Sequence, residues 1–274
     1  MTFALGLAVG SFLNVCIWRM PRDESVVRPP SHCPACDARL RARDLVPVFS
    51  FLLQGRKCRY CKAPISWRYA VVELTTAVAF LGLYLVDGAG APLLFDALLV
   101  AALIAIFAID LEHYIIPHEL NYFLMFTGVA REVYGRLATG QWSHPVHLLG
   151  IPVPASVVGI ALGVAVFAGI GWLGQLAFRQ ESMGGGDLRL AAGIGAHLGW
   201  LGLTASVVLA VVAGAVVGVG LIATGLRKRR EYIPFGPFIV LGALAVVYAG
   251  QWVVPGFLAL YGFHPENVPI RSWP

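Results

Sequence analysis

Residues 98–110 read Leu-Leu-Val-Ala-Ala-Leu-Ile-Ala-Ile-Phe-Ala-Ile-Asp, an uninterrupted apolar run that ends on a carboxylate. Extended back to Pro92, the run approaches the roughly 20 residues that a helix needs to cross a bilayer. A carboxylate within a span costs roughly 3 kcal/mol at mid-bilayer, so such residues tend to mark function. Asp110 lies at the end of the span, where an ordinary interfacial helix terminus explains it equally well.

The rest of the chain shares this apolar character. Of its 274 residues 58% are hydrophobic and only 13% are charged, with a mean hydropathy of +0.75. A soluble domain would be roughly a quarter charged. The sequence therefore predicts an all-α polytopic membrane protein with about eight transmembrane helices. The apolar runs lie at residues 1–18, 69–86, 92–109, 120–134, 152–178, 188–200, 201–226 and 235–254. Gly199 and Gly202 favour a turn between the sixth and seventh runs, although one long helix also fits.

Positive charge sets the orientation. Residues 19–68 hold eleven of the 20 Lys and Arg residues, and the positive-inside rule makes this loop cytoplasmic. If the helices alternate, residues 110–119, 179–187 and the basic cluster at 227–230 fall on the same side. The predicted organisation is a first transmembrane helix at 1–18, a cytoplasmic loop at 19–68, a transmembrane core at 69–254 and an outward-facing tail at 255–274. These loops account for the net charge of +5, and no nucleic-acid partner is predicted.

The cytoplasmic loop carries two Cys-x-x-Cys pairs, Cys33/Cys36 and Cys58/Cys61, with 21 residues between them. Two such pairs can converge on one tetrahedral Zn²⁺ through four thiolates, at a spacing close to that of zinc ribbons. Disulfides are rare in the cytoplasm. The alternatives to zinc are four free thiols or a redox pair. Four thiolates leave no position for water, so the predicted zinc is structural. Cys16 lies in the first span and is expected to be an inert buried thiol.

A second carboxylate, Asp187, follows Gly184, Gly185 and Gly186 and precedes another span. A flexible turn with a helix-capping aspartate is one interpretation; close approach of a substrate strand to the glycines is the other. The predicted topology puts Asp110 and Asp187 on the same side of the membrane at similar depth. Two carboxyl groups brought together in apolar surroundings do not ionise together easily. One provides a base that activates water and the other an acid, as in aspartic proteases.

Other candidates lie at the same predicted face. Pro234 and Gly236 precede the last span and could line a substrate groove or simply start a helix. Glu73 lies early in the second span, where it could pair with the basic loop or contribute to the active site.

These features together resemble the bacterial type IV prepilin peptidase family, the leader peptidases and N-methyltransferases of type IV pilus and type II secretion systems. The resemblance runs nearly end to end and covers five motifs in order: residues 10–21, the four cysteines, residues 109–110 with 116–117, residues 184–187 and residues 234–238. His118 stands where the family commonly has an acidic residue, and Arg189 where it usually has Lys.

The resemblance implies a GxGD-type aspartic membrane protease of the bacterial inner membrane, with Asp110 and Asp187 catalytic. Its substrates would be prepilins or pseudopilins, cut after a glycine on the cytoplasmic side. The large N-terminal loop resembles that of bifunctional members, which methylate the new N-terminus with S-adenosylmethionine. Two rivals remain: a protease without methyltransferase activity, as in preflagellin-type relatives, and a cation-coupled transporter whose aspartates bind the ion. The sequence leaves the oligomeric state open.

Overall fold

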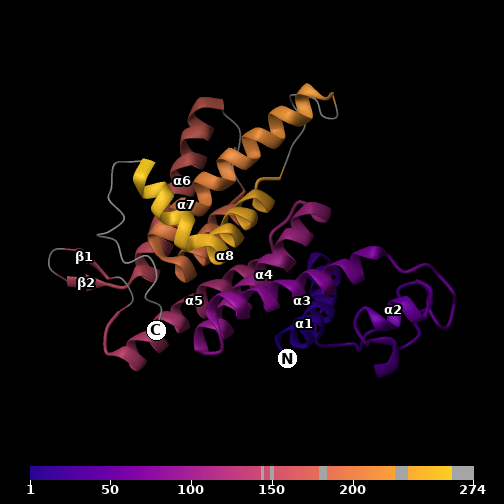
Figure 1. The fold of residues 1–274 in the computed structure, drawn as a ribbon. Coiled ribbons are helices and arrows are strands. Elements are labelled where there is room, and N and C mark those ends of the chain that lie inside the picture. The colour runs from indigo at the N-terminus through magenta and orange to yellow at the C-terminus, as the bar shows by residue number, and fades with distance from the viewer. Residues whose placement is uncertain (143–144, 149–150, 179–183, 226–233, 261–274) are drawn as a thin grey trace.

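A computed structural model describes residues 1–142, 145–148, 151–178, 184–225 and 234–260 of the protein (Figure 1). Seven long helices dominate it: α1 Thr2–Arg19, α3 Trp67–Asp87, α4 Ala91–His113, α5 His118–Thr139, α6 Ala155–Phe178, α7 Gly185–Ala223 and α8 Gly236–Leu260. The loop between α1 and α3 holds two 3₁₀ turns, η1 Met20–Arg22 and η2 Ala42–Asp44, and the short helix α2 Phe49–Leu53. The all-α polytopic fold is thus confirmed.

Six of the described helices are long and apolar enough to cross a membrane, against about eight predicted. The first difference is α5, which has the required length but is not among the six. It buries polar side chains, Asn121, Thr127 and Arg131 among them. Arg131 forms a buried ion pair with Asp96 of α4. Several of the polar residues that lower the hydropathy of α5 are therefore buried against other helices.

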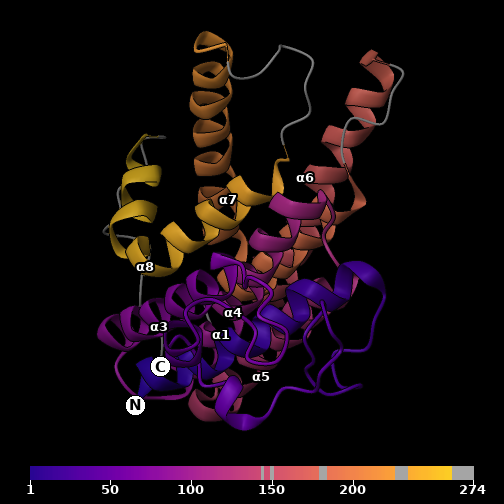
Figure 2. The same cartoon turned by 90° about the vertical axis from the view of Figure 1, so that its right-hand side faces the viewer.

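The second difference is one of counting: α7 is counted once among the six, but it contains two helices that correspond to the predicted spans at 188–200 and 201–226, the second ending at Ala223. Gly199 interrupts it with φ +66°, a left-handed conformation that glycine adopts without steric cost. The turn predicted at Gly199 is therefore confirmed, as a bend between two helical segments of α7. The second segment returns toward the aspartates, since a Cβ atom on Gly214 would meet Phe235 and Phe238 at the start of α8. The divergence of the far halves of α6 and α7 follows this bend (Figure 2).

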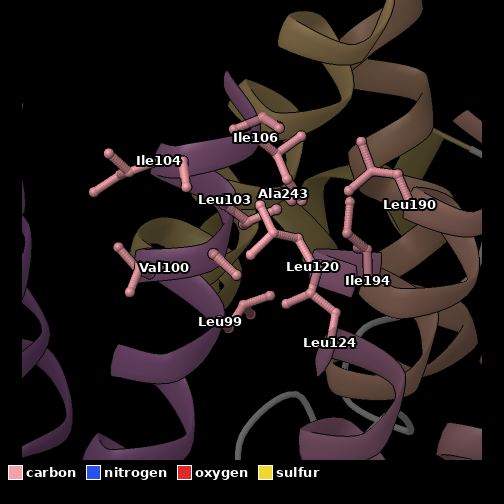
Figure 3. Close-up of a cluster of buried hydrophobic side chains, with 14 of the residues drawn as sticks. Leu99, Val100, Leu103, Ile104, Ile106, Leu120, Leu124, Leu190, Ile194 and Ala243 are labelled. Atoms are coloured by element: carbon pink, nitrogen blue, oxygen red, sulfur yellow. The ribbon is translucent and has the colours of Figure 1, made fainter. Parts of the chain in front are cut away.

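The apolar core lies where α4, α5, α7 and α8 meet (Figure 3). Leu103 and Ile106 of α4 are fully buried there, together with Leu190 of α7. Asp110 lies one turn beyond Ile106, and Asp187 lies one turn before Leu190. The core therefore fixes the two helix ends that carry the aspartates.

Two predicted boundaries differ from the structure. The run predicted to end at residue 134 continues as α5 to Thr139, and the loop to α6 begins there. This loop contains an antiparallel pair of strands, β1 Val146–Leu148 and β2 Ile151–Val153. Helix α8 continues to Leu260, past the expected start of the tail at residue 255. The rest of the predicted tail, and the basic cluster at 227–230, lie outside the described residues.

Candidate active site and metal centre

Asp110 belongs to the last turn of α4 and is 4% exposed. Ile106 and Ile109, both fully buried, anchor that turn in the core. The helix ends at Tyr114, whose φ of +59° turns the chain away from the helix axis. Asp110 thus sits at a helix end, next to the short segment that leads into α5.

Asp187 belongs to the first turn of α7 and is 7% exposed. Its backbone N–H donates to the carbonyl oxygen of Gly184 at 3.2 Å, which closes the turn. Gly184 and Gly185 are exposed, so bare backbone lies beside the buried carboxyl group. An extended peptide can approach such backbone closely because no Cβ stands in the way.

Ile116, Gly186 and Gly236 connect the surroundings of the two aspartates. A Cβ atom on Gly186 would lie 3.1 Å from Ile116 Cβ, and one on Gly236 would lie 3.1 Å from Ile116 Cδ1. The same Cβ on Gly236 would overlap Asp110 Oδ2. Asp110 and Asp187 are also close enough to interact electrostatically. Three helix ends, those of α4, α7 and α8, therefore meet around Ile116.

The remaining predicted lining residue near this point, Pro234, is buried immediately before α8 begins at Gly236. A proline at this position cannot donate a backbone hydrogen bond and so fits the entry of a helix. The structure thus gathers Asp110, Asp187, Gly186, Pro234 and Gly236 at adjoining helix ends. Two carboxyl groups beside open glycine backbone can hold a water molecule and a peptide carbonyl together, which is the arrangement that hydrolysis needs.

The cysteine-containing loop lies at the same end of the bundle as the aspartates. Arg68, in the first turn of α3, donates to Glu112 Oε2 at 2.6 Å. Glu112 follows Asp110 by two residues in the last turns of α4. The end of the loop and the end of α4 are therefore in direct contact.

The two Cys-x-x-Cys segments fold alike. In each, the N–H of the first cysteine donates across a small loop, from Cys33 to Ala38 and from Cys58 to Ala63. In each, the residue after the second cysteine has a positive φ, 54° at Asp37 and 63° at Lys62. This repeated turn directs both cysteines of a pair toward the same point.

The four Sγ atoms all lie within 4.8 Å of one another, and those of Cys33 and Cys61 are 3.9 Å apart. Tetrahedral Zn²⁺ with bonds of about 2.3 Å would hold its sulfurs about 3.8 Å apart, so the cluster fits this ion. The backbone N–H of Cys61 is the largest influence on the Cys58 thiol and lowers its pKa to about 7, although burial acts in the opposite direction. Cys58 can therefore supply a thiolate readily, whereas burial raises the pKa of the Cys33 thiol, which would ionise on binding the metal.

Asp44, which sequence reasoning missed, braces this centre. Its carboxylate accepts from Arg59 Nε at 2.7 Å and from Tyr60 Oη at 2.9 Å. Arg59 and Tyr60 are the two residues between Cys58 and Cys61. Burial raises the pKa of Asp44, but these bonds and that from the Arg41 N–H outweigh it and leave the pKa below its usual value. A lone Asp in a basic loop gave no signal of this role.

Glu73 has a partner that neither predicted role included. It is 7% exposed in α3, and its Oε2 accepts from the backbone N–H of Val48 at 2.7 Å. Within the described residues Glu73 forms no ion pair. It fastens the loop just before α2 to the second turn of α3.

Loss of cysteine ligands should lower the metal content. Purified wild-type protein is expected to carry about one Zn²⁺ per chain, because four thiolates complete one tetrahedral site. The Cys33→Ser/Cys36→Ser double variant should carry almost none when measured by mass spectrometry of the metal. Cys16→Ser is the matched control, since Cys16 lies in α1 apart from the cluster, and its zinc content should match that of the wild type. Equal zinc in all three proteins would rule out the four-cysteine site.

Comparison with known proteins identified two family models. Residues 4–86 match the bacterial peptidase A24 N-terminal domain, and residues 97–219 match the type IV leader peptidase family. The chain is similar to the prepilin leader peptidase/N-methyltransferase of Burkholderia pseudomallei strain 1026b, with 34% identity over 94% of this chain and 86% of the relative. It is similar to that of Aeromonas hydrophila, with 31% identity over 94% of each chain.

A third relative is the type 4 prepilin-like proteins leader peptide-processing enzyme of Escherichia coli O78:H11, with 34% identity over 89% of this chain and 91% of the relative. No solved structure gives a significant match. The first family model covers the cysteine cluster and Glu73, and the second covers Asp110, Ile116 and Asp187.

Proposed function

The chain belongs to the type IV leader peptidase family, and from this premise we propose that Asp110 and Asp187 form the catalytic pair of a prepilin leader peptidase. One observation carries the assignment of the two residues: α4, α7 and α8 meet around Ile116, so that Asp110 lies against Gly236 and Asp187 follows Gly186, and both glycines contact Ile116. The names of the relatives support prepilins and related pseudopilins as substrates.

In this proposal one carboxylate accepts a proton from water while the other, protonated, donates to the peptide group. Water attacks the carbonyl carbon of the scissile peptide bond, and the carbon–nitrogen bond then breaks as the nitrogen gains a proton. No covalent enzyme intermediate forms, as in other aspartic proteases. The exposed backbone at Gly184 and Gly185 supports an extended substrate at the open side of the pair.

The proposed site faces the cytoplasm. The contact between Arg68 and Glu112 links the aspartate end of α4 to residues 19–68. Those residues carry eleven of the 20 Lys and Arg residues, the charge distribution expected of a cytoplasmic loop. In a Gram-negative bacterium, a membrane protein whose active site faces the cytoplasm lies in the inner membrane.

The relatives' names also support a second activity, N-methylation of the new N-terminus with S-adenosylmethionine as methyl donor. The four-cysteine centre is proposed to hold structural zinc that folds the loop, because its sulfurs fit one ion and leave no position for water. A loop with few apolar contacts of its own depends on such a metal for much of its folding free energy.

Co-expression with a candidate prepilin tests both activities. The expected product, read by mass spectrometry of its N-terminus, lacks the leader and carries one added methyl group. A product that is cut but unmethylated would assign a protease without methyltransferase activity. A prepilin that stays uncut with several substrates, while the enzyme is inserted in the membrane, would contradict the peptidase.

A further inference from the structure

Large apolar side chains are exposed around α2, in the loop that carries the cysteines. Phe49 is 60% exposed, Leu52 59% and Leu53 86%. Leu45 and Val46, just before the helix, are exposed as well. We call these five residues the α2 surface. Contiguous exposed apolar side chains of this kind mark an interaction site rather than a water-facing loop.

The opposite side of α2 is fixed to α3. Phe51 is 5% exposed, and its ring lies 5.1 Å from that of Trp67, measured between centroids. The guanidinium of Arg56 lies 4.6 Å from the centre of the Trp67 ring. Trp67 is the first residue of α3. The α2 surface therefore faces outward from a helix that is held against the beginning of a membrane span.

The bond between Val48 and Glu73 sets the depth of α2. Glu73 follows Trp67 by six residues, which is roughly 9 Å along a helix. The polar interface on each side of a bilayer is about 5–8 Å thick. A tryptophan at the start of a span typically lies within that interface. Val48, held at 2.7 Å from Glu73, places α2 at the level where α3 enters the bilayer.

Basic residues flank the α2 surface in the sequence. Arg41, Arg43, Arg56 and Lys57 flank it and are all exposed. Across residues 19–68 there are eleven basic and four acidic residues, a net charge of +7 (11 − 4). One of the four acidic residues, Asp44, is buried and already paired. Apolar side chains bordered by cations are the composition of a segment that lies on an anionic membrane.

We propose that α2 is an interfacial anchor that seats the cysteine-containing loop on the cytoplasmic leaflet of the membrane. Phe49, Leu52 and Leu53 insert at the boundary between headgroups and acyl chains. The flanking cations bind the phosphate groups of anionic lipids such as phosphatidylglycerol. The metal centre is thereby held at the membrane surface, on the side of the bundle where Asp110 lies, rather than free in the cytoplasm.

Photo-crosslinking of the full-length protein in nanodiscs tests the insertion. A benzophenone side chain at position 53 should form lipid adducts with a yield comparable to that of one at position 78. Val78 is 57% exposed in the middle of α3 and serves as the lipid-facing control. Zinc content reports that each variant has folded. Lipid labelling at 78 without labelling at 53, or adducts at 53 with a co-expressed prepilin instead of lipid, would overturn the proposal.

Hydrogen exchange tests the charge component. Amides of residues 49–53 should exchange more slowly in nanodiscs with phosphatidylglycerol than in nanodiscs of phosphatidylcholine alone. At low salt, the ratio of the exchange rates in the two lipids should fall by about fivefold for each cation that the Arg43→Gln/Lys57→Gln variant removes. Arg136→Gln, which removes an exposed cation from the far end of α5, should leave the difference unchanged. Equal exchange of the wild type in both lipids would overturn the proposed anionic preference.

Discussion

Asp110→Asn and Asp187→Asn should each stop leader removal, with the rate of prepilin cleavage falling about 10⁴-fold or more. Asparagine keeps the size of the side chain but neither accepts the proton of water as a carboxylate nor donates one as an acid. Both aspartates are at least nine-tenths buried at helix ends. A carboxyl group on the protein surface therefore cannot easily take the place of either one. Immunoblots of a co-expressed prepilin would show only the uncut form.

Glu112→Gln is the matched control for these two variants. Glu112 lies two residues from Asp110 in α4, and its side chain is 39% exposed in a surface pair with Arg68. Such pairs contribute about 1 kcal/mol or less, so the variant should insert and cut nearly as the wild type does. Processing that persists in Asp110→Asn or Asp187→Asn would exclude that aspartate from the catalytic pair.

Gly236→Ala should reduce cleavage about 100-fold or more, although it adds only one methyl group. The new Cβ would overlap Asp110 Oδ2 and approach Ile116 Cδ1 to 3.1 Å, so the carboxyl group must move. A displacement of about 1 Å at a catalytic group can cost 10²-fold in rate. The measurement is the initial rate of leader cleavage by purified protein.

Gly256→Ala provides the comparison within the same helix. A Cβ on Gly256 meets no atom within 4 Å, so its insertion and rate should equal those of the wild type. If Gly236→Ala also retained the wild-type rate, the close contact between α8 and Asp110 would not be part of the active site.

The sequence alone predicts most of the site because its chemistry is local. The glycines before Asp187, the carboxylate that ends an apolar run at Asp110 and the two Cys-x-x-Cys pairs are each visible as short patterns. Loop charge predicts that they lie on one side of the membrane. The structure adds the contact that a sequence pattern does not contain, the packing of Ile116 against both Gly186 and Gly236.

The differences arise where tertiary contacts decide. Hydropathy predicts a weak span at residues 120–134, but it does not reveal that Arg131 is buried against Asp96. The turn near Gly199 is, by contrast, a local feature that the glycine pattern predicts correctly, because its φ of +66° favours glycine. Asp44 bonds to Arg59, 15 residues away, and Val48 bonds to Glu73, 25 residues away. The periodicity of a helix or a strand does not reveal contacts between residues so far apart in the sequence.

A double-mutant cycle tests most directly whether the two aspartates act as one catalytic unit. The measurement is the rate of prepilin cleavage by purified wild-type protein, Asp110→Asn, Asp187→Asn and the variant with both changes. Residues that act as a unit are strongly non-additive, so the double variant should be no slower than either single variant. Losses that multiply, or a single variant that cuts at the wild-type rate, would contradict a shared site.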